Sequence, residues 1–209
     1  SRPPSDLSMN GLAARLAGTP RPPRRFFAVP AASTATAAHA PAPRAPGPRL
    51  RIAVELDPPP HADPTPVLDQ ARVLRDAGVD WITVADSPLS SARMDPVVLS
   101  ARIQRETGIP CLPHLCCRDR NVNALRSLLL GAHAEGIRQV LCVTGDRIPE
   151  GQSGYAKPVF NVNSFGLLRM VREMNETVFP ESPLLPAAAM NPSAANPDAE
   201  RDRVLRKVE

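Results

Sequence analysis

The sequence predicts an α/β protein of the (β/α)8 barrel type, with about the first five βα units present. From residue 51 onward, short apolar runs alternate strictly with amphipathic helical segments, which implies parallel strands joined by right-handed crossovers. Each run is apolar on both faces, as a sheet covered by helices requires. An open doubly wound sheet also fits this alternation. We favour the barrel because no Gly-x-Gly-x-x-Gly follows the first strand-like run.

Individual elements follow from periodicity and from capping residues. Asp95 and Pro96 begin a helix, and Gly108 ends it. Asn121 is the expected cap of the next helix, which Gly136 terminates. The predicted strands are 51–55, 81–85, 109–115, 138–143 and 185–190, and the predicted helices are 64–77, 96–107, 121–135, 163–175 and 198–209.

Residues 1–50 differ in composition from the rest. They contain ten prolines, twelve alanines, seven arginines and one acid, and such a segment cannot bury enough apolar surface to order itself. We therefore divide the chain into a disordered extension or linker (1–50) and a partial barrel (51–209). An organelle transit segment is the alternative interpretation, because the stretch is rich in Arg and Ala and almost free of acids.

Charge and cysteine usage exclude several classes of protein. The whole chain carries +4 and residues 1–50 carry +6 (7 − 1), which leaves −2 (4 − 6) for the folded part and gives no basic surface for nucleic acid. Four cysteines lie in apolar runs without CxxC spacing, so we expect buried, reduced thiols and no metal site. No apolar run approaches the ~20 residues that span a bilayer. We expect a soluble, cytoplasmic protein, unless residues 1–50 direct import.

Polar residues occupy or follow the carboxyl end of every predicted strand. In a parallel sheet these ends lie on one rim, where ligands bind. Glu55, between Val54 and Leu56, is expected to be desolvated and to have a raised pKa, as suits a general acid. His114 is either a base or a hydrogen-bonded core residue. The complete set is Glu55, Asp86, His114, Thr144, Asp146 and Asn191.

Other polar residues have simpler interpretations. Asp86, before Ser87 and Pro88, is typical of a turn cap. The charged run 118–121 is typical of a solvated loop, with an arginine that reaches a phosphate as the alternative. Glu200 and Lys207 are seven residues apart on one helix face, too far for a salt bridge, which is typical of a solvated face.

Several short motifs together resemble the flavin-dependent 5,10-methylenetetrahydrofolate reductases, and the resemblance runs from about Arg51 to Glu209. The form fused behind a homocysteine S-methyltransferase domain is the most similar, so such a domain is one expectation for the region upstream of Ser1. Because the family has eight βα units, the chain is expected to be a fragment. The motifs are Val54-Glu55-Leu56-Asp57-Pro58-Pro59, Ile82-Thr83-Val84-Ala85-Asp86-Ser87-Pro88, Arg93-Met94-Asp95-Pro96, Leu112-Pro113-His114-Leu115, Asp119-Arg120-Asn121, Gly136-Ile137-Arg138, Val143-Thr144-Gly145-Asp146 and Asn191-Pro192.

The resemblance implies FAD-dependent reduction of 5,10-methylenetetrahydrofolate to 5-methyltetrahydrofolate by NAD(P)H, in one-carbon and methionine metabolism. It implies that Glu55 is the general acid that helps open the imidazolidine ring of the folate. It also implies that Asp146 lies between flavin and pterin. The implied flavin contacts are Asp146, His114, Thr144, Gly145, Phe160, Asn161, Asn191, Glu200 and Lys207.

Two alternatives to this function stay open. One is an inactive, truncated remnant of such an enzyme. The other is a different barrel enzyme that uses the carboxylates of Glu55 and Asp146 without a flavin. The expected partners are a folate substrate, with neither nucleic acid nor membrane, and assembly of the chain with copies of itself stays open.

Overall fold

A computed structural model describes residues 51–148 and 157–208. The expectations for residues 1–50 fall outside the described residues. Five parallel strands form one sheet in the order β1-β2-β3-β4-β5. The strands are β1 (Ala53–Leu56), β2 (Trp81–Val84), β3 (Cys111–Cys116), β4 (Gln139–Val143) and β5 (Leu185–Ala188).

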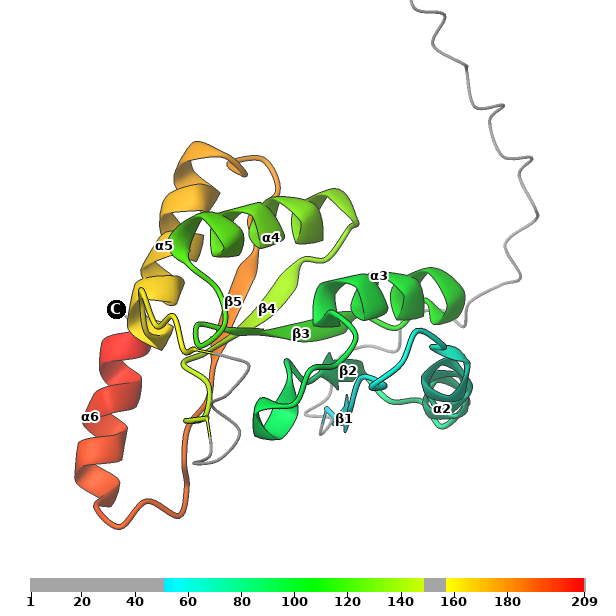
Figure 1. Cartoon of the computed structure of the whole chain (residues 1–209), viewed down its shortest axis with the longest axis horizontal. Coiled ribbons are helices and arrows are strands. Elements are labelled where there is room, and N and C mark those ends of the chain that lie inside the picture. Colours follow the sequence, from blue (N-terminus) through cyan, green and yellow to red (C-terminus); the bar gives the residue numbers. More distant parts are fainter. Residues whose placement is uncertain (1–50, 149–156, 209) are drawn as a thin grey trace, which may run out of the picture. The chain divides into compact units, whose positions relative to one another are not determined.

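A helix follows each strand, as the alternation predicted. The helices are α2 (Thr65–Asp76), α3 (Pro96–Thr107), α4 (Val122–Ala134), α5 (Ser164–Thr177) and α6 (Pro197–Val208), with a short 3-10 turn, η1 (Pro88–Ser90), after β2 (Figure 1). The predicted and observed boundaries differ by one or two residues at most positions. Among the described residues, no helix is long and apolar enough to cross a membrane.

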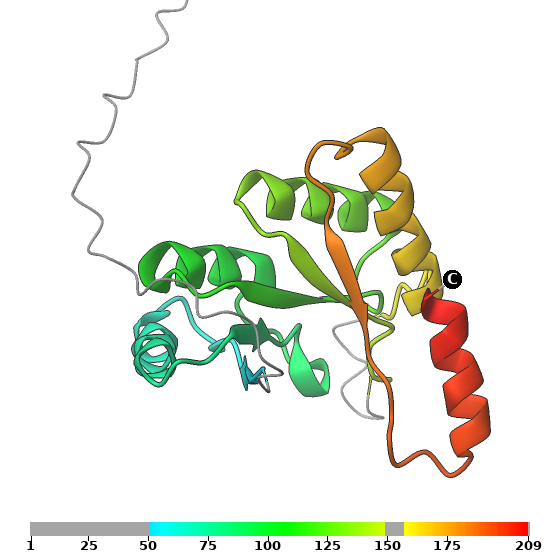
Figure 2. The same ribbon diagram turned by 180° about the vertical axis from the view of Figure 1, so that it is seen from behind.

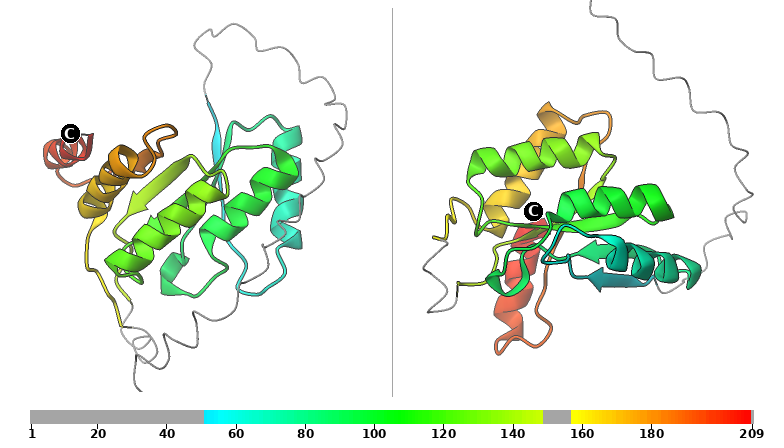
Figure 3. Two further views of the ribbon diagram at one scale, coloured as in Figure 1. Left: turned by 90° about the horizontal axis from the view of Figure 1, so that it is seen from above. Right: turned by 45° about the vertical axis from the view of Figure 1, so that its right-hand side comes forward.

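Helices α2 to α5 lie on one face of the sheet. Helices α2, α3, α4 and α5 lie side by side in chain order (Figure 3, left), and each packs against the next. Strands in chain order with helices on one face form the arrangement of a barrel wall, whereas a doubly wound sheet has helices on both faces. The barrel-type fold is therefore confirmed. The open doubly wound sheet, which was the alternative, does not fit this arrangement of helices α2 to α5.

Alternating burial along the strands shows which face packs on the helices. In β2 to β4 the buried side chains include Ile82, Val84, Leu115, Val140 and Cys142, and they join the helical side chains in one core. The residues between them point to the opposite face, because successive strand residues alternate. That second face carries Glu55 and His114 and is only partly covered.

The capping predictions are confirmed. The Asp95 side chain accepts hydrogen bonds from the backbone N–H groups of Val97 (2.8 Å) and Val98 (3.2 Å) at the start of α3. Asn121 caps α4 by accepting from Ala124 N (2.9 Å). These caps matter to the site because they fix the loops that connect each strand end to its helix.

Helix α6 differs from the other helices in its packing. It follows a long loop after β5 and stands beside the end of that strand (Figures 1 and 2). Lys207 is its one buried residue, and the Lys207 Nζ donates a hydrogen bond to the Ala189 carbonyl (2.7 Å). This hydrogen bond connects the last turn of α6 to the chain after β5.

Candidate active site

Two of the expected site residues meet on the uncovered face of the sheet. Glu55 on β1 and His114 on β3 approach across β2, and the Glu55 Oε2 lies 3.5 Å from the His114 Nε2. The atoms do not form a hydrogen bond, and the His114 Nε2 is buried without a hydrogen-bond partner among the described residues. The site thus contains a carboxylate beside an imidazole nitrogen that has an unused hydrogen-bonding position.

The expected desolvation of Glu55 is wrong. Its side chain is 57% exposed, although Val54 and Leu56 flank it in sequence. The reason is geometric, since the two neighbours point to the helix-covered face and cannot shield a side chain on the other face. Glu55 is therefore free to reach a ligand bound over the open face of the sheet.

Burial favours the neutral form of His114. Its side chain is only 14% exposed, and burial lowers the pKa of the ring, although the charges of Glu55, Asp86 and Asp57 act in the opposite direction. A histidine whose pKa lies below the ordinary value is mostly uncharged near pH 7. A neutral imidazole can donate a hydrogen bond from one nitrogen and accept one at the other.

The structure corrects the turn-cap interpretation of Asp86. The Asp86 side chain is 1% exposed and forms an ion pair with Arg120. Its Oδ2 also accepts a hydrogen bond from the Cys116 backbone N–H (2.9 Å). Arg120 extends the network to Asp95 (3.3 Å), the cap of α3. Asp86 therefore connects the end of β2 to the end of β3 and, through Arg120, to the start of α3. Its buried side chain supports the rim and is not exposed at it.

The solvated-loop interpretation of residues 118–121 is wrong for the two arginines, whereas Asp119 and the helix cap Asn121 are exposed as expected. Arg118 is 2% exposed, and the side chain of Arg120 is largely buried. Both arginines pair with carboxylates, Arg118 with Asp119 and Arg120 with Asp86, which offsets the cost of burying charge. The partners of Arg120 lie 25 and 34 residues away in sequence, so a local pattern could not show them.

Gly145 marks the close approach of the β4 loop to the end of β3. Its φ is +94°, and a Cβ built on it would lie 2.2 Å from the Cys116 Sγ and 3.0 Å from the Arg118 Cβ. Thr144, just before it, accepts a hydrogen bond from the Ser164 N–H at the start of α5 (3.1 Å). The side chain of Asp146 is exposed and makes no hydrogen bond or ion pair with another described residue. The Asp146 carboxylate is thus accessible at the rim.

Replacing Gly145 with alanine should lower the free energy of unfolding by about 2–3 kcal/mol, because a left-handed residue and an overpacked contact each cost ~1 kcal/mol or more. Gly108→Ala is the matched control, since Gly108 has φ +75° but no atom within 4 Å of the added Cβ. Adding Cys116→Ala to Gly145→Ala should remove part of the overpacking. The loss in the free energy of unfolding, measured by urea unfolding, should then approach the loss caused by Gly108→Ala. Equal losses in the two single variants would show that the contact with Cys116 is unimportant.

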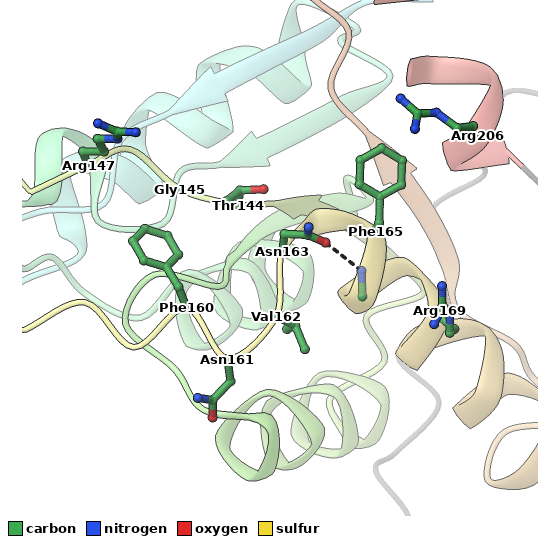
Figure 4. A pocket seen from close by; sticks show the side chains of 11 residues that line it. Thr144, Gly145, Arg147, Phe160, Asn161, Val162, Asn163, Phe165, Arg169 and Arg206 are labelled. Atoms are coloured by element: carbon green, nitrogen blue, oxygen red, sulfur yellow. Dashed lines mark hydrogen bonds between the residues drawn. The ribbon is translucent and has the colours of Figure 1, made fainter. Parts of the chain in front are cut away.

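A cavity of about 1100 Å³ opens beside the Thr144-Gly145 turn (Figure 4). Four predicted flavin contacts line it, Thr144 and Gly145 from the β4 loop and Phe160 and Asn161 before α5. Sequence reasoning did not identify its three arginines, which carry the positive charge of the cavity. The remaining lining residues are Arg147, Val162, Asn163, Phe165, Gly166, Arg169 and Arg206.

The three predicted contacts near α6 are engaged with one another and with the backbone. Glu200 accepts a hydrogen bond from the Asn191 N–H (2.8 Å) and pairs with Arg203. The bond from Arg203, and then that from Asn191, lower the pKa of Glu200 to about 2. Lys207 binds the Ala189 carbonyl. None of the three lines the cavity of Figure 4, whereas Arg206, adjacent to Lys207, does.

The four cysteines are buried free thiols, as predicted. Burial raises the pKa of Cys111 and of Cys142 to about 12 and that of Cys117 to about 11. Such thiols are protonated near neutral pH and are weak nucleophiles. Across residues 51–148 and 157–208, no group of three or more His, Cys, Asp or Glu side chains could hold a metal ion.

Comparison with known proteins places the chain in a family. The family model described as methylenetetrahydrofolate reductase matches residues 46–209, and no curated protein matches. Among solved structures, the chain is similar to a D-allulose 3-epimerase from Methylomonas sp., with 12% identity and a TM-score of 0.41. That likeness covers 76% of this chain and 59% of the other. Because the family model covers most of the chain, including the whole sheet and its rim, the chain belongs to the methylenetetrahydrofolate reductase family.

Proposed function

We propose that the chain carries the site for FAD-dependent reduction of 5,10-methylenetetrahydrofolate to 5-methyltetrahydrofolate, with NAD(P)H as the electron donor. Membership of the family is the observation that carries the proposal. The pairing of Glu55 with His114 on the open face supports it, because a proton donor must stand where a folate can reach it.

The side chains around the cavity fit FAD. Arg147, Arg169 and Arg206 offer cationic donors that suit a pyrophosphate. Phe160 and Phe165 offer aromatic faces that suit planar rings. The cavity volume of about 1100 Å³ lies just above the usual range of ligand pockets, roughly 300–1000 Å³. When bound, FAD would supply hydride transfer, and the protein would supply placement and electrostatics.

Glu55 has the acid role in this proposal. Its carboxyl would give a proton to the amine nitrogen that leaves the bridging carbon of the folate as the imidazolidine ring opens. A folate over the open face would exclude water from a side chain that is now 57% exposed, and this desolvation favours the protonated acid. His114, neutral beside Glu55, would hold the carboxyl or the ligand by a hydrogen bond without competing as a proton source. Asp146, exposed at the rim, would hydrogen-bond the pterin.

Purified full chain supplied with FAD should retain flavin absorbance through gel filtration and should oxidise NAD(P)H in the presence of methylenetetrahydrofolate. Arg206→Gln should weaken FAD binding by about tenfold or more, since a hydrogen bond to a charged group contributes roughly 1.5–3 kcal/mol. Arg201→Gln, on the same helix but outside the lining of this cavity, should leave the affinity unchanged. If the folded protein is incubated with excess FAD and then elutes from gel filtration without flavin absorbance, the proposal is contradicted.

A further inference from the structure

Arg118 is a buried cation placed between three loops of the rim. It is 2% exposed, and its Nε and Nη2 bind the Asp119 carboxylate at 2.7–3.1 Å. This paired arrangement balances the charge. The hydrogen bond with Asp119 also raises the pKa of Arg118, so the guanidinium stays charged. The Asp119 carboxylate neutralises the charge of Arg118, and the other N–H donors of the guanidinium remain available to the neighbouring loops.

Those other donors reach the loops after β2 and β4. The Arg118 Nη2 donates to the Ser87 carbonyl (3.1 Å), and the Nη1 donates to the Ser90 Oγ (2.9 Å). The Nη1 also approaches the Asp146 carbonyl at 3.5 Å. The Ser90 hydroxyl in turn donates to the Arg147 carbonyl (3.4 Å). A single side chain therefore connects loops that are 28 to 31 residues apart from it in sequence.

The loop after β2 has a backbone that needs such support. Ser87, Leu89 and Ser90 have φ values of 46°, 53° and 60°, and a non-glycine residue in the left-handed region costs about 1–2 kcal/mol. Strain of this kind persists only where surrounding contacts fix it, and it is concentrated at functional sites. Arg118 binds two of these three residues. The stem of Arg118 also lies under Gly145, at 3.0 Å from the position of a Cβ, so the β4 loop rests on it.

From these contacts we infer that Arg118 is a positioning residue, which holds the loop of Asp146 at the rim by joining it to the strained loop after β2. The inference rests on the proposed function, because it acts through Asp146. Lysine could keep the charge beside Asp119 but could not reach both loops, since it lacks the planar fork. Displacement of a reacting group by about 1 Å costs up to 10²-fold in rate.

The test is a double-mutant cycle in the full chain loaded with FAD. Arg118→Lys should slow oxidation of the reduced flavin by methylenetetrahydrofolate by about 10- to 100-fold and should shift the visible spectrum of the bound flavin. In an Asp146→Asn background, Arg118→Lys should slow this oxidation little further, because the effects of substituting two residues that act as a unit are not additive. Multiplicative losses, or an unchanged rate in Arg118→Lys, would overturn the inference.

Two further variants separate positioning from folding. Arg138→Lys is the matched control, because Arg138 also binds backbone carbonyls and a serine hydroxyl, but at the opposite end of β4, and it should leave the spectrum unchanged. If Arg118→Lys fails to fold, Ser90→Ala removes one acceptor of Arg118 and should slow the same step by several-fold. An unchanged rate in Ser90→Ala would then overturn the inference. A wild-type chain that binds FAD but never reduces the folate would instead refute the proposed function.

Discussion

Asp86→Ala is expected to lower the free energy of unfolding by about 3–5 kcal/mol, the usual cost of removing one partner from a buried ion pair. The substitution leaves the largely buried Arg120 with only its longer contact to Asp95. It also leaves the buried Cys116 N–H without its acceptor. For a domain of this size the loss corresponds to a fall of roughly 10 °C in Tm, which thermal unfolding of the full chain would detect.

Two comparisons make the Asp86 experiment specific. Glu173→Ala breaks the exposed pair with Arg126 and should cost under about 1 kcal/mol. Adding Arg120→Met to Asp86→Ala should recover much of the loss, because replacing both partners of a buried pair by apolar groups is often close to neutral. If Asp86→Ala were as mild as Glu173→Ala, the network would not stabilise the fold.

Local sequence patterns predicted the fold because its determinants are local. Helix caps such as Asp95 and Asn121 act within three residues, and their contacts were predicted correctly. The order of the strands followed from the strict alternation of elements, since short right-handed crossovers place each new parallel strand beside the last. Boundaries differ slightly, as at β1, which begins at Ala53 two residues after the predicted start.

The environment of each site residue was less predictable because it depends on distant partners. The exposure of Glu55 was misjudged from neighbours that point to the other face. The burial of Arg118 and Arg120 was missed because charged runs are normally solvated. The left-handed residues Ser87 and Leu89 carry no glycine or asparagine signal, and the contacts of Arg118 that accompany them come from another loop.

Glu55→Gln is expected to reduce the rate of folate reduction by about 10²- to 10⁴-fold, the range attributed to general acid catalysis. Glutamine keeps the shape of glutamate but has no carboxyl proton to give. Reduction of the bound flavin by NAD(P)H needs no such proton and should keep its rate. Stopped-flow measurement of the two half-reactions would separate these outcomes. Because Glu55 is exposed, the substitution should change the free energy of unfolding by no more than about 0.5 kcal/mol. The Tm should therefore stay close to that of the wild-type chain.

Asp57→Asn is the matched control for loss of negative charge near His114. The charges of both Glu55 and Asp57 raise the pKa of His114 against the effect of burial, so either substitution should lower that pKa further in an NMR titration of the ring. Only Glu55→Gln should also slow folate reduction by about 10²- to 10⁴-fold. If Asp57→Asn slowed folate reduction as much as Glu55→Gln, the negative charge near His114, and not a proton from Glu55, would control the rate. If Glu55→Gln kept the wild-type rate while the pKa of His114 fell as expected, Glu55 would be a neighbour of the imidazole without an acid role.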